Sequence, residues 1–128
     1  MEIRTHNPDD GVYATGGDWV HAVEVREPQR IVYLSGTMGL AADSTPGADL
    51  AAQLELVWSN IRRILAAADL TVDDIVRVTS YLRDPAYAAE NAAARVKALG
   101  GRAVATTAIV AQTLAEDWLV EIEVIAAA

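Results

Sequence analysis

The chain has 128 residues, of which 52% are apolar, so it is expected to form one domain over residues 1–128. It contains neither an apolar run long enough to span a membrane nor a signal pattern, so a cytoplasmic location is expected. Its formal net charge of −8, with ten basic residues against eighteen acidic ones, disfavours binding to nucleic-acid phosphates. The absence of cysteine excludes disulfides, thiol catalysis and cysteine-based zinc sites.

The first half of the chain predicts strands followed by a long helix. A strand is expected over residues 2–5, and a glycine-rich loop over residues 11–18. Residues 19–27 alternate and predict a second strand, which a Glu-Pro-Gln turn joins as a hairpin to the β-prone run over residues 30–39. A helix is expected within residues 43–70, because apolar residues recur there at helical spacing and form one stripe, whose members are Leu50, Leu54, Val57, Ile61 and Leu65. Gln53 and Glu55 mostly lie off this stripe.

The second half predicts one more helix and three more strands. Residues 71–74 form a capping-type turn before a strand over residues 75–82. Asp84 and Pro85 begin the second helix, and Gly100 with Gly101 ends it. The order ββ(β)αβαββ predicts an α+β fold, with a mixed sheet and both helices packed on one of its faces.

The last strand carries carboxylates on one side. Val120, Ile122 and Val124 point to one face of the sheet, which suits the helix layer. The opposite face receives both carboxylates and large apolar groups, namely Leu119, Glu121, Glu123 and Ile125. Because this mixture does not suit a surface that meets only water, a partner subunit is expected to cover it.

Five segments in order along the chain resemble one known family. They are "HAVEV" after an aromatic residue, "IVYLSGTMG", "QLELVWSNIRRILAAADLTVDDIVRVTSYLRD", "AAENAAA" and the closing "LVEIEVIA". Together they resemble the Rid family, the reactive intermediate deaminases also called YjgF-like proteins. The resemblance implies a chorismate-mutase-like fold and a homotrimer, in which the sheets form a central barrel and small-molecule sites lie in clefts between subunits.

The resemblance also implies an activity, the hydrolysis of reactive enamines and imines such as 2-aminoacrylate to a keto acid and ammonia. No metal or organic cofactor is needed for it. Glu121 matches the glutamate that faces the cleft and positions or deprotonates the water, so it is the expected catalytic residue. Substrate-binding roles are expected for Trp19, Ser35, Gly36, Thr37, Asn91 and Thr106.

Several of these positions depart from the family pattern. Thr106 stands where the family has the arginine that clamps a substrate carboxylate. Arg102 is the one nearby candidate for a displaced arginine, although it starts about a dozen ångströms further along the strand. Trp19 takes the place of a tyrosine, and Thr37 that of a glutamine.

Two functions follow from this comparison. The first is a Rid-like hydrolase or tailoring enzyme for a labile imine or enamine whose substrate differs from 2-aminoacrylate because the arginine is missing. The alternative is a non-catalytic trimer that binds a metabolite or a protein partner. Structural roles remain open for the site residues: Glu121 as a backbone-bonded carboxylate, Asn91 as a loop tie, and Trp19 as a core or interface aromatic.

Overall fold

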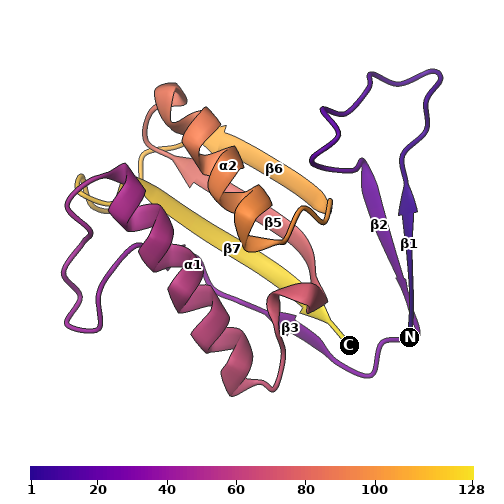
Figure 1. Cartoon of the computed structure of the whole chain (residues 1–128), viewed down its shortest axis with the longest axis horizontal. Helices are drawn as coiled ribbons and strands as arrows, with labels where there is room; N and C mark the ends of the chain where they lie inside the picture. Colours follow the sequence, from indigo (N-terminus) through magenta and orange to yellow (C-terminus); the bar gives the residue numbers. More distant parts are fainter.

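A five-stranded sheet carries both helices on one face, and a two-stranded hairpin stands beside it (Figure 1). The computed structural model describes all 128 residues. No helix is both long and apolar enough to cross a membrane. The elements are β1 (Glu2–His6), β2 (Ala22–Arg26), β3 (Ile31–Tyr33), β4 (Thr37–Met38), α1 (Leu50–Ala67), β5 (Ile75–Leu82), α2 (Ala88–Ala98), β6 (Ala105–Val110) and β7 (Val120–Ala127).

The main sheet is mixed, as the sequence predicts. Its strand order is β3-β7-β5-β6, and β4 pairs with β7 beyond the end of β3. β5 and β6 run parallel, whereas β7 is antiparallel to β3, β4 and β5. β7 therefore lies in the middle of the sheet although it is the last strand in the chain.

Helix α1 packs on the sheet through the predicted stripe. Asp49 caps its first turn by accepting a hydrogen bond from the backbone N–H of Ala52. All five predicted stripe residues are buried, and they form the core together with the helix-facing residues of β5 and β7. Gln53 is also buried, contrary to its expected place off the stripe, because its amide bonds to the backbone of Gly47, Asp117 and Leu119 and so ties two loops to the helix.

Helix α2 begins and ends where the sequence predicts. Asp84 caps a short 3₁₀ turn over Pro85–Tyr87, and α2 follows directly. Gly100 and Gly101 end the helical segment with φ angles of 63° and 82°, in the left-handed region that glycine adopts without steric cost. The residues that α2 buries are Asn91, Arg95 and Ala98.

The two faces of the sheet differ as the alternation in β7 predicts. Val120, Ile122 and Val124 are buried under the helices. The other face, called the open face below, carries Glu121 and Glu123 of β7 beside Tyr81 and Thr79 of β5, which pair with them.

The predicted hairpin between residues 19–27 and 30–39 is wrong. β2 pairs only with β1, and β3 pairs only with β7 (Figure 1). The connection contains Pro28, which has no N–H to donate, and the amides of Gln29 and Arg30 both donate to the carbonyl of Ala128. These hydrogen bonds fix the connecting residues beside the end of β7, so β2 and β3 do not form a hairpin with each other.

Candidate functional site

Glu121 lies at the edge of a cavity on the open face. It is half-buried and pairs with Tyr81 of β5 on one side and with Met38 of β4 on the other. The cavity measures about 210 Å³, and its wall is formed by Tyr81, Ala111, Gln112, Thr113, Leu114 and Glu121. No hydrogen bond from within the chain reaches the Glu121 carboxylate, so its oxygens are available to a ligand or water.

Gly36 lets the Glu121 side chain approach the backbone of the β3–β4 connection. A Cβ at position 36 would lie 2.5 Å from Oε1 of Glu121 and 2.9 Å from its Cδ. Real Cβ atoms do not approach so closely, so only glycine fits this place without moving the carboxylate. Gly36 also lines, with its neighbours Ser35 and Thr37, a shallow hollow of about 610 Å³ next to α1.

The two neighbours of Gly36 differ in solvent exposure. Ser35 is exposed, whereas Thr37 is buried and its hydroxyl donates to the carbonyl of Ser35 at 3.0 Å. Ser35, Gly36, Thr37 and Glu121 are thus the predicted site residues that the chain itself brings together. Of these, Thr37 has a structural role, because its hydroxyl stabilises the turn that contains Gly36.

A second segment of the cavity wall is fixed by Arg83. Its guanidinium donates to the hydroxyl of Thr113 at 2.7 Å and to the carbonyls of Thr113 and Ala115. The Thr113 hydroxyl in turn lies 2.7 Å from the carbonyl of Trp118. This network orders the loop between β6 and β7, whose Leu114 is 93% exposed at the mouth of the cavity.

Tyr81 joins the Glu121 cavity to Glu123. Its hydroxyl donates to Oε1 of Glu123 at 2.7 Å. This hydrogen bond raises the pKa of the Tyr81 phenol above its usual value, and partial desolvation and the charges of Glu123 and Glu121 act in the same direction, while the charge of Arg77 opposes them. Tyr81 is therefore a neutral donor over the whole physiological pH range, and Glu123 is engaged as a structural acceptor.

Arg77 is the cation of the open face. It lies on β5 four residues before Tyr81, and its guanidinium donates to the hydroxyl of Thr107 at 3.0 Å. At about 3.3 Å per residue, the two positions are about 13 Å apart along the strand. The cavity around Glu121 consequently has no basic side chain in its wall.

Thr106 does not lie on the open face with Glu121. It pairs with Val78 of β5, which is fully buried under the helices, whereas its neighbour Thr107 pairs with Thr79 and shares the face of Glu123. The Thr106 hydroxyl donates to the carbonyl of Val104 in its own strand. Within one chain, Thr106 and Glu121 therefore belong to opposite faces.

Arg102 is not a displaced clamp in this chain. Its guanidinium donates to the carbonyls of Val72 and Ile75, both at 2.8 Å, and its Nε is buried. Ile75 pairs with Ala126, at the opposite end of β7 from Glu121. Arg102 thus holds the turn that precedes β5.

Trp19 and Asn91 also lie away from Glu121. Trp19 precedes Val20, which forms a bridge with Ala105 on the outer edge of β6, so β5 and β6 separate Trp19 from β7 by about 14 Å. Trp19 packs edge-on against His21, with ring centroids 5.3 Å apart. Asn91 is buried beneath α2, and its side-chain oxygen has no hydrogen-bond partner.

Tyr81 and Arg77 are the open-face residues that the sequence analysis missed. The signal was present, because strict alternation along residues 75–82 places Arg77, Thr79 and Tyr81 on one face. No group of three or more His, Asp or Glu side chains is arranged to hold a metal ion.

Comparisons with known proteins agree on one family. The sequence profile described as Endoribonuclease L-PSP matches residues 12–128. A curated relative, the RutC family protein YjgH of Escherichia coli (strain K12), is 42% identical over 55 residues, which are 43% of this chain and 42% of that protein, so the match spans less than half of the relative's length.

Solved structures match the whole fold. A Rid family protein of unknown function from Yersinia pestis, YyfB, has a TM-score of 0.81 and 29% identity, with all of both chains covered. RidA from the Antarctic bacterium Psychrobacter sp. PAMC 21119 has a TM-score of 0.73 and 28% identity, over 98% of this chain and 100% of that one. The sequence match, together with a mixed sheet that carries both helices on one face, shows that this chain belongs to the Endoribonuclease L-PSP family and is a Rid protein of the YjgF type.

Proposed function

We propose that the protein is a Rid-like hydrolase of a small imine or enamine that carries no carboxylate beside the reacting carbon. The observation that supports this most directly is the free carboxylate of Glu121, packed on Gly36 at the edge of a cavity without a basic side chain. A carboxylate that makes no internal hydrogen bond can orient a water molecule and accept its proton.

The proposed reaction needs no group beyond the protein and water. The oxygen of a water molecule bonds to the imine carbon while Glu121 accepts one of the water's protons and passes it to the imine nitrogen, which gives a neutral carbinolamine. Glu121 then accepts the hydroxyl proton of the carbinolamine and delivers it to the nitrogen as the C–N bond breaks, so a carbonyl product and ammonia leave and Glu121 is again a carboxylate. The Tyr81 hydroxyl is committed to Glu123, so in this scheme it shapes the cavity wall and keeps its proton.

The chemistry of the cavity argues for a substrate without a carboxylate. Binding an anion next to Glu121 would require a compensating cation, and the nearest candidates are occupied: Arg83 by the loop that it anchors, and Arg77 by Thr107. The position that the family resemblance assigns to the clamping arginine holds Thr106, which offers no charge. A neutral imine avoids the repulsion from Glu121.

We also propose that the active unit is a homotrimer whose subunits meet through the open face. Apolar side chains stay uncovered in a single chain on β3, on β6 and in the loop before β7, and Tyr33 is 72% exposed. Covering them would remove apolar area from water. In such an assembly Trp19, at the outer edge of β6 in one subunit, completes a cleft around Glu121 of another, whereas Asn91 and Thr106 lie on the helix-covered side and stay outside it. Light scattering after size-exclusion chromatography tests this, and a monomer would contradict it.

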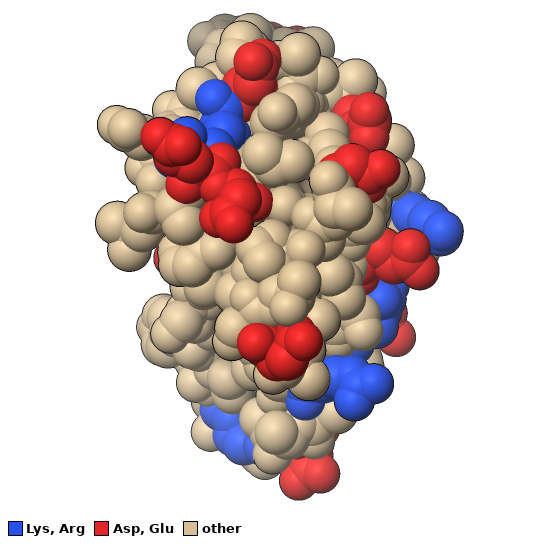
Figure 2. All heavy atoms as spheres, turned by 90° about the vertical axis from the view of Figure 1, so that its left-hand side faces the viewer, with Lys and Arg blue, Asp and Glu red and all other residues tan.

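RNA cleavage is not part of this proposal, although the matching family profile is named after an endoribonuclease. The chain is strongly acidic, and Figure 2 shows one face on which basic groups form no continuous patch. Carboxylates repel a phosphate backbone and provide no binding site for it.

A paired assay tests the proposed activity and its substrate class. An amine oxidase generates a neutral imine from a primary amine, and an amino-acid oxidase generates the corresponding carboxylate-bearing imine; the decay of each is followed in the ultraviolet. We expect the protein to accelerate decay of the neutral imine and to leave the other near its spontaneous rate.

Two variants assign the activity to the cavity. Glu121→Gln should abolish the acceleration without changing the melting temperature, and Glu116→Gln, an exposed carboxylate in the loop before β7, should retain it. Faster decay of the carboxylate-bearing imine would overturn the substrate class. Absence of any turnover, with Glu121→Gln still binding an unreactive analogue as the wild type does, would favour a non-catalytic binding protein.

A further inference from the structure

The cavity beside Glu121 is bounded by β7, β5 and the segment that follows β6. In the sheet β5 lies between β7 and β6, so Glu121 of β7 and the end of β6 are on opposite sides of Tyr81. Adjacent strands are about 4.8 Å apart, which separates the backbones of β6 and β7 by about 10 Å. The wall across from Glu121 consists of Ala111, Gln112, Thr113 and Leu114. A molecule in the cavity therefore meets Glu121 on one side and this segment on the other.

Gln112 lies between two neighbours whose positions are fixed. Beyond the end of β6, the N–H of Ala111 donates to the carbonyl of Leu82 at 2.9 Å. Thr113 is buried, and its hydroxyl accepts a hydrogen bond from the Arg83 guanidinium at 2.7 Å. The side chain of Gln112 therefore projects from an ordered backbone, as a residue that selects a substrate requires.

The carboxamide of Gln112 is uncommitted, whereas the hydroxyl groups of the wall are engaged. The Tyr81 hydroxyl donates to Glu123, and the Thr113 hydroxyl lies 2.7 Å from the carbonyl of Trp118. Gln112 is exposed, lines the cavity and makes no side-chain hydrogen bond within the chain. Both its N–H groups and its oxygen are therefore available to a ligand.

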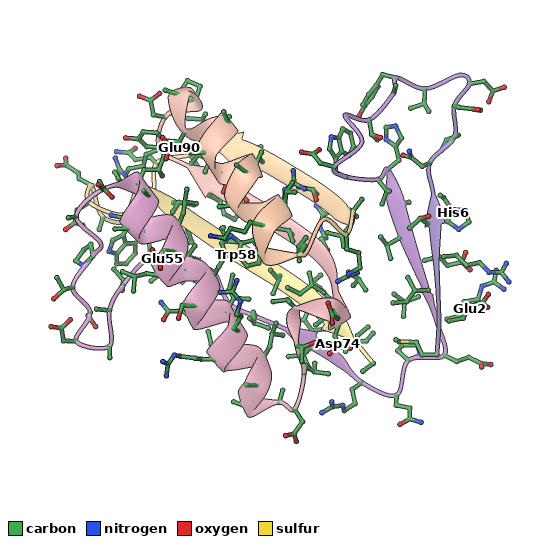
Figure 3. The ribbon with its side chains drawn as sticks, viewed as in Figure 1. Glu2, His6, Glu55, Trp58, Asp74 and Glu90 are labelled. Atoms are coloured by element: carbon green, nitrogen blue, oxygen red, sulfur yellow. The ribbon has the colours of Figure 1, made fainter.

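No other polar side chain is available to a ligand on this side of the cavity. Figure 3 labels Glu55 and Trp58 on α1 and Glu90 on α2, the helices that cover the opposite face of the sheet, and none of the three lines the cavity. Glu121 is the proton acceptor of the proposed hydrolysis. Gln112 is consequently the side chain of the wall that can donate to a substrate without giving up another hydrogen bond.

A carboxamide side chain favours a particular chemical group. Its N–H donates to a carbonyl and its oxygen accepts from an N–H, so it forms two parallel hydrogen bonds with another carboxamide and no charge is involved. A carboxylate has no N–H to offer and is repelled by the charge of Glu121. A methyl ketone offers only the acceptor and leaves the oxygen of the side chain unpaired.

We propose that Gln112 determines the specificity of the cavity and that the substrate is a 2-imino amide, an imine whose reacting carbon is bonded to a carboxamide. The proposal rests on the proposed hydrolase function and names its substrate class. The substrate amide pairs with Gln112, and the imine carbon lies toward the water that Glu121 orients. Water adds and ammonia leaves, so the product is a 2-oxo amide. The cavity of about 210 Å³ has the volume of about seven water molecules, which admits a substrate with a short apolar substituent.

Unreactive analogues test the recognition without turnover. 2-Hydroxypropanamide, lactate and 3-hydroxybutan-2-one have the same number of non-hydrogen atoms and differ only in the group at one end. Each is titrated into the full chain and followed by ligand-observed nuclear magnetic resonance. The amide should bind about tenfold more tightly than either of the others, because it alone forms both hydrogen bonds. Equal affinities, or no binding of the amide, would overturn the proposal.

Variants assign the recognition to Gln112. Gln112→Leu should abolish the preference for the amide, and Gln112→Arg should transfer it to lactate, because a guanidinium binds a carboxylate through two parallel hydrogen bonds. A purely structural role would not produce such an inversion. Gln29→Leu makes the same change at an exposed glutamine beside Ala128, at the opposite end of β7, and should keep the preference. An amide preference that survives in Gln112→Leu would overturn the assignment.

The specificity and the hydrolase activity fail in different ways. Turnover of a neutral imine by the wild type, without an amide preference in the titrations, would overturn the role of Gln112 and leave the hydrolase in place. An amide preference that depends on Gln112, without acceleration of any imine decay, would overturn the hydrolase and the 2-imino amide as its substrate. Gln112 would then be the amide-binding residue of a non-catalytic protein.

Discussion

The contact between Gly36 and Glu121 determines where the candidate catalytic carboxylate lies. The close approach is possible because residue 36 has no side chain, and the backbone there is not in the left-handed region, so alanine would bring a steric conflict but no backbone strain. The atoms that would collide belong to the flexible end of Glu121, which can rotate away.

Gly36→Ala is therefore expected to separate stability from activity. Displacing the Glu121 side chain to another rotamer should cost about 1 kcal/mol in the free energy of unfolding. The proposed imine hydrolysis should fall far more, because the carboxylate leaves its place. Urea unfolding and the imine-decay assay measure the two effects. Gly16→Ala, where a Cβ meets only ordinary contacts, should change neither, and full activity in Gly36→Ala would contradict the assigned position.

Tyr81 gives a prediction about pH. Its pKa is raised mainly by the hydrogen bond to Glu123, so its contribution to stability is complete below the normal tyrosine pKa and is lost as pH rises through the higher pKa of the folded state. Spectrophotometric titration should show one tyrosine that ionises later than the others, and this component should disappear in Tyr81→Phe. Glu123→Gln should return it toward the normal range; an unchanged titration in Glu123→Gln would show another cause.

The elements most dependent on packing are α1 and the strands beneath it. Ile61 is fully buried in the core, whereas Ile64, one turn later on the same helix, is 45% exposed. The two positions have the same residue type and the same helical context, so they form a matched pair for measuring burial alone.

Ile61→Ala should lower the free energy of unfolding by about 3 kcal/mol, because it removes buried atoms and leaves a cavity. Ile64→Ala should cost less than about 1 kcal/mol in the isolated chain. Urea denaturation of both variants gives the comparison. Equal losses would show that a partner subunit or another contact buries Ile64.

The molecule as a whole consists of the helix-covered sheet and the β1–β2 hairpin, which are joined by few contacts. Arg95 of α2 is buried and donates to the backbone carbonyl of Asp18 at 2.6 Å and to its carboxylate at 3.3 Å. The N–H of Val20 donates to the carbonyl of Val104. An isolated two-stranded hairpin is marginally stable, so these contacts hold it in place.

Arg95→Met should release the hairpin and leave the sheet folded. Hydrogen exchange followed by mass spectrometry should show faster exchange in residues 1–26 and unchanged protection in β5 and β7. A double-mutant cycle with Asp18→Ala measures the coupling between the two residues. Uniform loss of protection across the chain would mean instead that Arg95 supports the core.

Local patterns predicted most of the fold but only part of the candidate site. The apolar stripe of α1, the cap at Asp84 and the alternation of β7 depend on neighbouring residues, and all three were confirmed. β2 does not form the predicted hairpin with β3, because the backbone amides of Gln29 and Arg30 between them donate to the carbonyl of Ala128. Ala128 is far away in the sequence, so no local pattern contains that information. The face of Thr106 likewise depends on its register with Val78.

The central position of β7 has a consequence for how the chain is made. β7 pairs with β3, β4 and β5, all of which precede it, and Ile31 meets its partner Ala127 only when nearly all residues described here have been synthesised. Until then β5 and the short strands before it lack their central neighbour, and their apolar side chains stay uncovered on the ribosome. Pairings so distant in the chain also fold slowly. The interval before β7 emerges is therefore the stage at which the nascent chain is most prone to aggregate.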